Sequence, residues 1–186
     1  SPIKNMPRIQ EIIKTFEHII IIEEFIPGKT LAELLEKGTF DVENSISIIL
    51  DICRIVEELQ ARNIVHRDIK PSNIIISDAG DVFLLDINVA KFKDDSAKED
   101  TTFLGTQFYA APEQYGFGEN ASNEKTDVYA LGVLLNVMIT GEYPKIKKAP
   151  EEIYQIIEKC ISLDQIKRCS LQDLIMQLEK VRMEKC

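Results

Sequence analysis

The chain has 186 residues, of which 45% are hydrophobic and 28% are charged, and its formal net charge is −9. This length supports one packed core and is too short for two ordinary domains. The acidic balance argues against nucleic acid and direct membrane contact, because both require a basic face, and it is compatible with a basic protein substrate.

Four cysteines are scattered along the chain without a C-x-x-C pair: Cys53, Cys160, Cys169 and Cys186. Neither a zinc site nor a disulfide framework is expected from this pattern, and a reducing cytoplasm is the default location. The isoleucine run from Ile19 to Ile22 is far shorter than a membrane span, and no signal peptide precedes it. The opening Ser1, in place of an initiator Met, leads us to expect a section of a longer protein.

The first part of the chain predicts two short strands, Arg8 to Phe16 and His18 to Ile26. Isoleucine dominates the second, and a continuous β-branched run is typical of a strand buried on both faces. Pro27-Gly28 ends it, and Thr30 is expected to cap a short helix from Leu31 to Lys37.

The clearest helical pattern follows, with Asn44 as the expected N-cap and Asn63 as the left-handed residue at its end. Between them, apolar residues recur at helical spacing: Ile46, Ile49, Leu50, Cys53, Val56 and Leu59. Two β-rich segments, Ile74 to Ile76 and Val82 to Leu85, flank a turn sequence and predict a hairpin.

The second half of the chain begins with a polar, irregular stretch from Lys91 to Phe108, which predicts a long loop. Asp127 to Thr140 is apolar on every side, as expected of a helix through the middle of a core. Two amphipathic helices are expected from Glu151 to Cys160 and from Ser170 to Arg182. The predicted class is mainly α within α+β, a helical bundle with small β-hairpins.

Residues 66–73 read H-R-D-I-K-P-S-N and resemble the catalytic loop H-R-D-x-K-P-x-N of eukaryotic-type (Hanks-type) Ser/Thr protein kinases. The resemblance implies that Asp68 orients the attacking hydroxyl and accepts its proton, that Lys70 steadies the γ-phosphate of ATP, and that Asn73 binds Mg²⁺. Downstream, Asp86-Ile87-Asn88 resembles the D-F-G triplet, which implies that Asp86 is the second magnesium ligand and contacts ATP.

Residues 105–113 resemble the end of the kinase activation segment, G-T-x-x-Y-x-A-P-E. The resemblance implies that Thr106 contacts the catalytic loop and shapes the pocket for the acceptor residue. It also implies a buried ion pair between Glu113 and Arg168, and a role for Asp127 in bracing the backbone of the catalytic loop.

Residues 22–26 resemble the kinase hinge. The resemblance implies that adenine is read by the carbonyl of Glu24 and the N–H of Ile26, with Ile75 as the apolar floor.

By this resemblance, residues 1–26 are the last two strands of the small N-terminal lobe and the hinge, and residues 27–186 are the C-terminal lobe. The catalytic loop would span 66–73 and the activation segment 86–113. The chain contains no G-x-G-x-x-G motif and no V-A-I-K lysine, so the N-terminal lobe is expected to be largely missing from this section. The region between Gly141 and Cys160 is expected to lack a helix that family members carry, which indicates a compact, bacterial-like form.

Two functions remain open. The parent protein is expected to transfer the γ-phosphate of ATP to Ser or Thr hydroxyls of proteins, with ATP and Mg²⁺ as cofactors and with little or no activity in this chain alone. The alternative is a pseudokinase or a truncated module that only binds other proteins. In either case the apolar strand edge within residues 8–26 predicts self-association.

Overall fold

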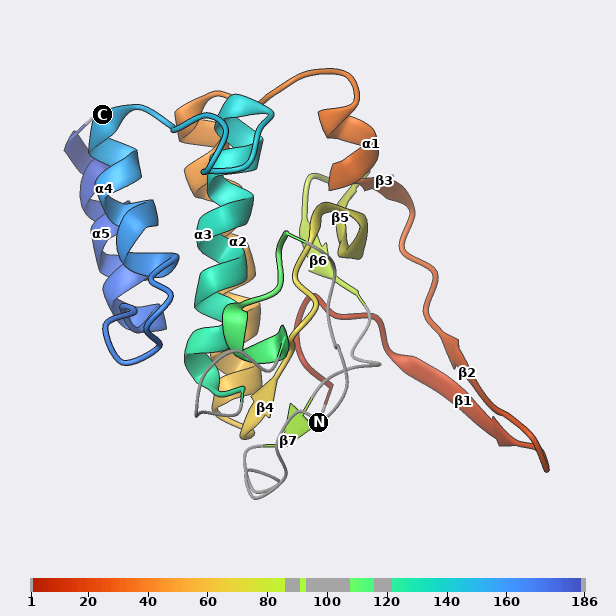
Figure 1. Cartoon of the computed structure of the whole chain (residues 1–186). Helices are drawn as coiled ribbons and strands as arrows, with labels where there is room; N and C mark the ends of the chain where they lie inside the picture. Colours follow the sequence, from red (N-terminus) through yellow and green to blue (C-terminus); the bar gives the residue numbers. More distant parts are fainter. Residues whose placement is uncertain (1, 86–90, 93–107, 116–121, 185–186) are drawn as a thin grey trace.

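The structure, a computed structural model, describes residues 2–85, 91–92, 108–115 and 122–184. Its body is helical (Figure 1), as predicted for a mainly α protein. Helices α2 (Val42–Gln60) and α3 (Glu124–Thr140) run through the centre, and helices α4 (Glu151–Cys160) and α5 (Leu171–Glu184) pack on one side of them. A small sheet lies on the other side, and the residues beside it form the candidate site.

Helix α3 is the central element of the core, and the prediction for this helix is confirmed. Its side chains are buried on nearly all sides, from Val128 to Met138. Gly141 ends it in the left-handed conformation, with φ of 76°. Gly132 allows α3 to approach α4 closely, because a Cβ atom at this position would lie 2.5 Å from Cβ of Cys160.

Helix α2 begins earlier than the apolar pattern indicated. Its N-cap is Asp41, and the Asp41 side chain accepts a hydrogen bond of 2.7 Å from the backbone N–H of Asn44. The prediction of Asn44 as N-cap was therefore wrong, because the first turn is largely outside the core and carries no apolar periodicity. Asn63 adopts the left-handed conformation that was predicted, with φ of 59°.

The small sheet has the order β3-β5-β6 and is antiparallel throughout. Strands β5 (Ile74–Ser77) and β6 (Val82–Leu84) form the predicted hairpin, and β3 (Gly28–Thr30) pairs with β5. Thr30 caps helix α1 (Leu31–Leu35) through a capping box, which confirms its predicted role. A further pair joins β4 (Ile64–Val65) to β7 (Lys91–Phe92), and β7 falls where an irregular loop was expected.

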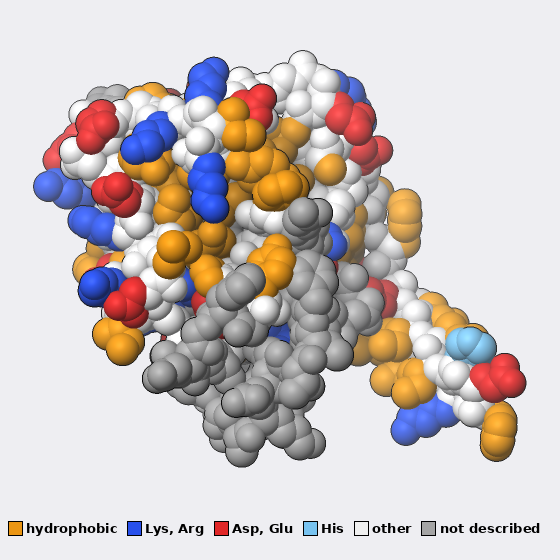
Figure 2. Space-filling view, viewed as in Figure 1, with side chains coloured by type: hydrophobic (Ala, Val, Ile, Leu, Met, Phe, Trp, Pro, Cys, Tyr) orange, Lys and Arg blue, Asp and Glu red, His pale blue; other side chains and the backbone are white. Residues whose placement is uncertain are grey.

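The two predicted N-terminal strands, β1 (Ile9–Lys14) and β2 (Ile19–Glu23), form an antiparallel hairpin that projects from the helical body (Figure 1). Strand β2 was expected to be buried on both faces, and this prediction was wrong. The exposed fraction is 65% at Ile19 and 39% at Ile22. In the described part of the chain, β2 pairs only with β1, and hydrophobic side chains lie exposed along the hairpin beside charged ones (Figure 2).

The helices seen in the described ranges are all too short or too polar to cross a membrane.

Candidate active site

The catalytic loop follows β4 and is held by a carboxylate from α3. Oδ2 of Asp127 accepts a hydrogen bond of 2.9 Å from the backbone N–H of His66, and Oδ1 accepts one of 2.8 Å from that of Arg67. Arg67 adopts a left-handed backbone with φ of 69°, which is unfavourable for a side chain of this size. Asp127 is 1% exposed and thus fixes a strained turn from inside the core.

Burial raises the pKa of Asp127, and this effect outweighs the neighbouring His66 and the two backbone donors, which act in the opposite direction. The contacts place Asp127 in the loop-bracing position that the family resemblance implied. Because its carboxylate is buried and bound to the loop backbone, we infer that Asp127 has a structural role and holds the shape of the catalytic loop.

Three of the predicted site residues lie together in the catalytic loop, whose last residues form the 3-10 turn η1 (Pro71–Asn73). The amide nitrogen Nδ2 of Asn73 donates to the backbone oxygen and to Oδ2 of Asp68, each at 2.9 Å. Nζ of Lys70 lies 2.7 Å from the same Oδ2 of Asp68. The structure therefore brings a carboxylate, an ammonium group and an amide into direct contact.

The end of strand β6 is attached to this cluster from two sides. The backbone N–H of Leu85 donates to the carbonyl of Asn73 at 2.8 Å, and Nε2 of the fully buried His66 lies 3.0 Å from the carbonyl of Leu85. Asp86 is the next residue along the chain and lies outside the described residues, as does Thr106. The backbone that leads into Asp86 is thus fixed beside Asn73.

The residues present fit a magnesium ion by their donor chemistry. Because Nδ2 of Asn73 donates to Asp68, its amide oxygen Oδ1 is the atom available to a cation, and amide and carboxylate oxygens are the ligands that Mg²⁺ prefers. No group of three or more His, Cys, Asp or Glu side chains gathers as a metal cluster within the described ranges.

The residues predicted to contact adenine lie outside the catalytic loop, before strand β3 and in strand β5. Ile26 is buried just before β3, and Ile75 is half-buried in β5, where it is paired with Thr30. Glu24 is exposed, and its contacts are with Arg8 at the base of the β1–β2 hairpin: its backbone N–H donates to the Arg8 carbonyl at 2.8 Å. The predicted adenine contacts thus stay predictions.

The predicted ion pair at the end of the activation segment is confirmed. Nη1 and Nη2 of Arg168 lie 2.7 Å and 3.1 Å from the two carboxylate oxygens of Glu113, and both side chains are buried. Thr126 and Gln165 donate further hydrogen bonds to Oε1 of Glu113. This network joins the 3-10 turn η3 (Pro112–Tyr115) to the start of α3 and to the loop between α4 and α5.

Gln114 connects the activation segment to the catalytic loop and was missed from the sequence. Its Nε2 donates to the carbonyl of Arg67 at 2.8 Å, and its Oε1 accepts from the N–H of Ala111 at 3.0 Å. The only signal was its place directly after A-P-E, because nothing in the local pattern indicates that this side chain points inward.

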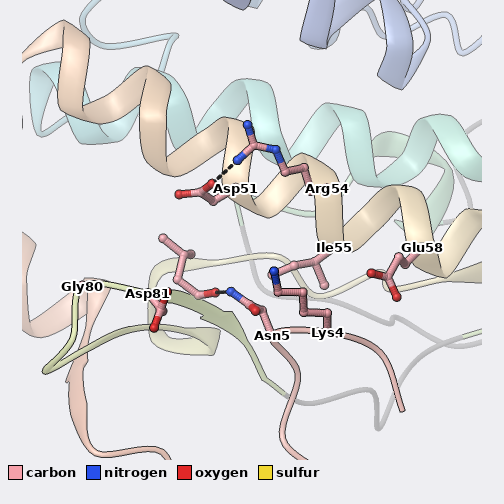
Figure 3. Close-up of a pocket in the computed structure, with 9 residues that line it drawn as sticks. Lys4, Asn5, Asp51, Arg54, Ile55, Glu58, Gly80 and Asp81 are labelled. Atoms are coloured by element: carbon pink, nitrogen blue, oxygen red, sulfur yellow. Dashed lines mark hydrogen bonds and ion pairs between the residues drawn. The ribbon is translucent and has the colours of Figure 1, made fainter. Parts of the chain in front are cut away.

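A polar hollow of about 210 Å³ lies away from the catalytic loop, between the N-terminal segment and α2 (Figure 3). Several of its polar groups bind one another: Arg54 pairs with Asp51, and Nδ2 of Asn5 donates to the carbonyl of Val82 at 2.9 Å. The carbonyl of Asn5 also accepts from Leu84 of β6. These contacts attach the N-terminal segment to the sheet, which is a structural role.

A larger, mostly apolar groove of about 830 Å³ lies beside the end of the activation segment. Its lining includes Phe108, Tyr115, Tyr129, Tyr143 and Leu163. The rings of Phe108 and Tyr143 are 4.9 Å apart between centroids. The groove borders the segment after Gly141, where the sequence was expected to lack a helix that family members carry.

Comparison with known proteins agrees with this geometry. The protein kinase domain family matches residues 2–149. A probable serine/threonine-protein kinase of Clostridium perfringens is 35% identical over 164 residues, which cover 84% of this chain and 24% of that protein. Mitogen-activated protein kinase kinase 1 of Arabidopsis thaliana is 32% identical over 167 residues, 83% of this chain and 46% of that protein.

The serine/threonine-protein kinase PknB of Mycobacterium leprae is 33% identical over 143 residues, 75% of this chain and 23% of that protein. The chain spans less than half the length of each of these three relatives. The family match over most of the chain and these similarities show that the chain belongs to the protein kinase domain family, in its Hanks-type form.

Proposed function

We propose that this protein transfers the γ-phosphate of ATP to Ser or Thr hydroxyls of protein substrates, and that this chain supplies the catalytic lobe. The observation that carries the proposal is the direct contact of Asp68 with Lys70 and Asn73. Phosphoryl transfer requires little covalent chemistry from the protein and depends on positioning and on neutralising charge. A carboxylate, a cation and an amide held at one point meet this requirement.

In this proposal, Asp68 orients the acceptor hydroxyl and takes its proton. Lys70 holds a positive charge 2.7 Å from the Asp68 carboxylate, where it can contact the transferred phosphate. The lysine position resembles that of Ser/Thr-specific kinases, and Thr106 would shape the pocket for the acceptor residue.

Asn73, through Oδ1, and Asp86 would hold Mg²⁺, which when bound neutralises phosphate charge. The attachment of Leu85 to Asn73 supports this pairing, because it fixes the backbone directly before Asp86 beside the amide ligand. The carbonyl of Glu24, the N–H of Ile26 and the apolar side chain of Ile75 would bind the adenine of ATP.

The proposal is tested by Mg²⁺-dependent phosphate transfer from labelled ATP to a basic protein, with the protein expressed from its natural gene. Phosphoserine or phosphothreonine is the expected product. Transfer to tyrosine alone contradicts the Ser/Thr assignment, and the complete absence of transfer favours the pseudokinase alternative. The 186-residue chain alone is expected to show little or no transfer, because it carries no glycine loop and no V-A-I-K lysine.

The proposed partners are proteins that carry a Ser or Thr acceptor. The net charge of −9 favours basic substrates, and the apolar groove beside Phe108 and Tyr143 offers a surface for residues that flank the acceptor. The proposed location is the cytoplasm, whose ordinarily reducing conditions are compatible with the free thiols of Cys53, Cys160 and Cys169.

Self-association through residues 8–26 is also proposed. Residue Ile12 faces Ile21, and Ile13 faces Ile20, so the hairpin is apolar on both of its faces and exposed on both. Such a two-stranded sheet invites pairing with a second copy. Sedimentation at rising concentration should show dimers or larger species, and an Ile21→Lys variant should shift the distribution to monomers. A strictly monomeric wild-type chain contradicts the proposal, and Lys14→Ile serves as a control that should not weaken association.

A further inference from the structure

Two cysteines that appear scattered in the sequence meet in the structure. Cys160 is the last residue of α4, and Cys169 lies two residues before α5. Their Sγ atoms are 3.5 Å apart, and the backbone N–H of Cys169 donates to the carbonyl of Lys159 at 3.1 Å. The spacing of the cysteines in the sequence does not show this contact, because it arises where the loop between α4 and α5 brings its two ends together.

The two thiols have unequal environments. Cys160 is completely buried in the core, whereas Cys169 is partly exposed. The hydrogen bond from Cys160 lowers the pKa of Cys169, and the same hydrogen bond together with burial raises the pKa of Cys160. Since the thiolate is the nucleophile in thiol chemistry, Cys169 is the thiol placed to react first.

The distance between the thiols is short enough for a covalent bond with a small rearrangement. A disulfide has a sulfur–sulfur distance of about 2.05 Å, so the two sulfur atoms must approach by about 1.5 Å. The hydrogen bond between Cys169 and Lys159 already holds the two backbone segments side by side. Cys53 is also fully buried, and burial raises the pKa of its thiol, which makes it a poor first nucleophile.

We propose that Cys169 and Cys160 form a reversible redox-active pair, which a low-molecular-weight disulfide such as oxidised glutathione modifies first at Cys169. The Cys169 thiolate attacks one sulfur of the glutathione disulfide, forms a mixed disulfide and releases one glutathione thiolate. Cys160 then gives its proton to a thiolate or to water and attacks the Cys169 sulfur, which releases the second glutathione. The two protein thiols are oxidised, and one glutathione disulfide is reduced to two thiols.

The bridge would close the loop that supports the buried ion pair. This loop contains Arg168 and Gln165, which both bind Glu113, and it contains Ser162, whose carbonyl accepts from Arg168. Cys160 is itself packed against Gly132 of α3. Oxidation would therefore join the two ends of this loop covalently and reduce the freedom of this region in the unfolded chain.

The test is incubation of the purified chain with oxidised glutathione, followed by trypsin digestion and mass spectrometry without reduction. Trypsin cleaves after Lys159, Lys167 and Arg168, so the bridge would join peptide 160–167 to peptide 169–180. The unfolding temperature should rise by roughly 5–10 °C on oxidation and return after dithiothreitol. A Cys160→Ala variant should retain one glutathione on Cys169, and Cys169→Ser should form no bridge in this region. Cys186→Ser is the matched control and should behave as the wild type does.

A glutathione adduct that persists on Cys169 in the wild type would overturn the proposal, as would no reaction or a bridge to Cys53 or Cys186. The peptide mapping of the wild-type chain decides between these outcomes even if Cys160→Ala does not fold. The readout is chemical, so it is independent of whether the protein transfers phosphate.

Discussion

Replacing Asp68 by Asn is expected to slow phosphate transfer from ATP to Ser or Thr by a factor of roughly 10²–10⁴. The carboxylate in this position would orient the acceptor hydroxyl and take its proton, and an amide cannot take that proton. An Asn side chain at position 68 keeps an oxygen that can accept the hydrogen bond from Nδ2 of Asn73. The loop should therefore keep its shape while the chemistry is lost.

The rate is measured with the protein expressed from its natural gene and labelled ATP, beside an unfolding curve for each variant. Asp51→Asn is the matched control, because Asp51 lies on the exposed side of α2 and pairs with Arg54. This control should transfer phosphate at the wild-type rate. If Asp68→Asn and Asp51→Asn have equal rates, Asp68 has no catalytic role.

The second large effect is expected on stability. Arg168→Ala should lower the free energy of unfolding by about 3–5 kcal/mol, because it leaves the carboxylate of Glu113 buried without its partner. The lost bonds also include those from Arg168 to the part-buried carbonyls of Ser162 and Lys125. Urea unfolding of the purified chain measures the effect.

Lys167→Ala is the control for this variant. Lys167 is the neighbouring residue, its side chain is 79% exposed, and its nearest carboxylate is 3.7 Å away on Asp164. Its loss should cost less than about 1 kcal/mol. A double variant, Glu113→Gln with Arg168→Met, should recover part of the stability lost in Arg168→Ala. A cost for Arg168→Ala as small as that for Lys167→Ala would show that the ion pair does not hold this region.

The effect of Arg168→Ala should depend on pH. Burial alone would raise the pKa of Glu113, but the hydrogen bond and positive charge of Arg168 outweigh it and hold this pKa below its ordinary value. A carboxyl whose pKa is lower in the folded than in the unfolded state stabilises the fold above the unfolded-state pKa, and this contribution is lost as the pH falls through the folded-state pKa. The free energy of unfolding of the wild type should therefore approach that of Arg168→Ala as the pH falls into the acid range.

Several elements could be predicted from sequence because local pattern and tertiary environment agree. Helix α3 is apolar on every side, which predicts that it is buried in the core, and Gly141 marks the point where the helix ends. The contact of Asp68 with Lys70 and Asn73 follows from the catalytic-loop motif, since these residues are close in sequence and the loop conformation is short-range. The pair Glu113–Arg168 required the family resemblance, because no local pattern joins residues so far apart.

Other features depended on contacts that the sequence does not display. The isoleucines of β2 predict burial, but a strand is buried only if other strands or helices pack against it, and the composition of the strand does not show whether they do. The N-cap of α2 lies outside the apolar stripe that locates the helix, so the stripe pointed to Asn44 and not to Asp41. The inward orientation of Gln114 and the contact between Cys160 and Cys169 depend on the paths of loops, which local sequence patterns do not show.

The proposed function requires Asp68 and Asn73 to lie beside a divalent ion and the phosphates of ATP. The most direct measurement is NMR of the ¹⁵N-labelled chain with ATP, in which Mn²⁺ replaces Mg²⁺ as a paramagnetic probe. Selective broadening of the backbone amides of residues 68–70 and 72–74, with sharp signals from α5, is the predicted result, and Asn73→Ala should weaken it. Broadening that spares the catalytic loop while other regions are affected would contradict the account.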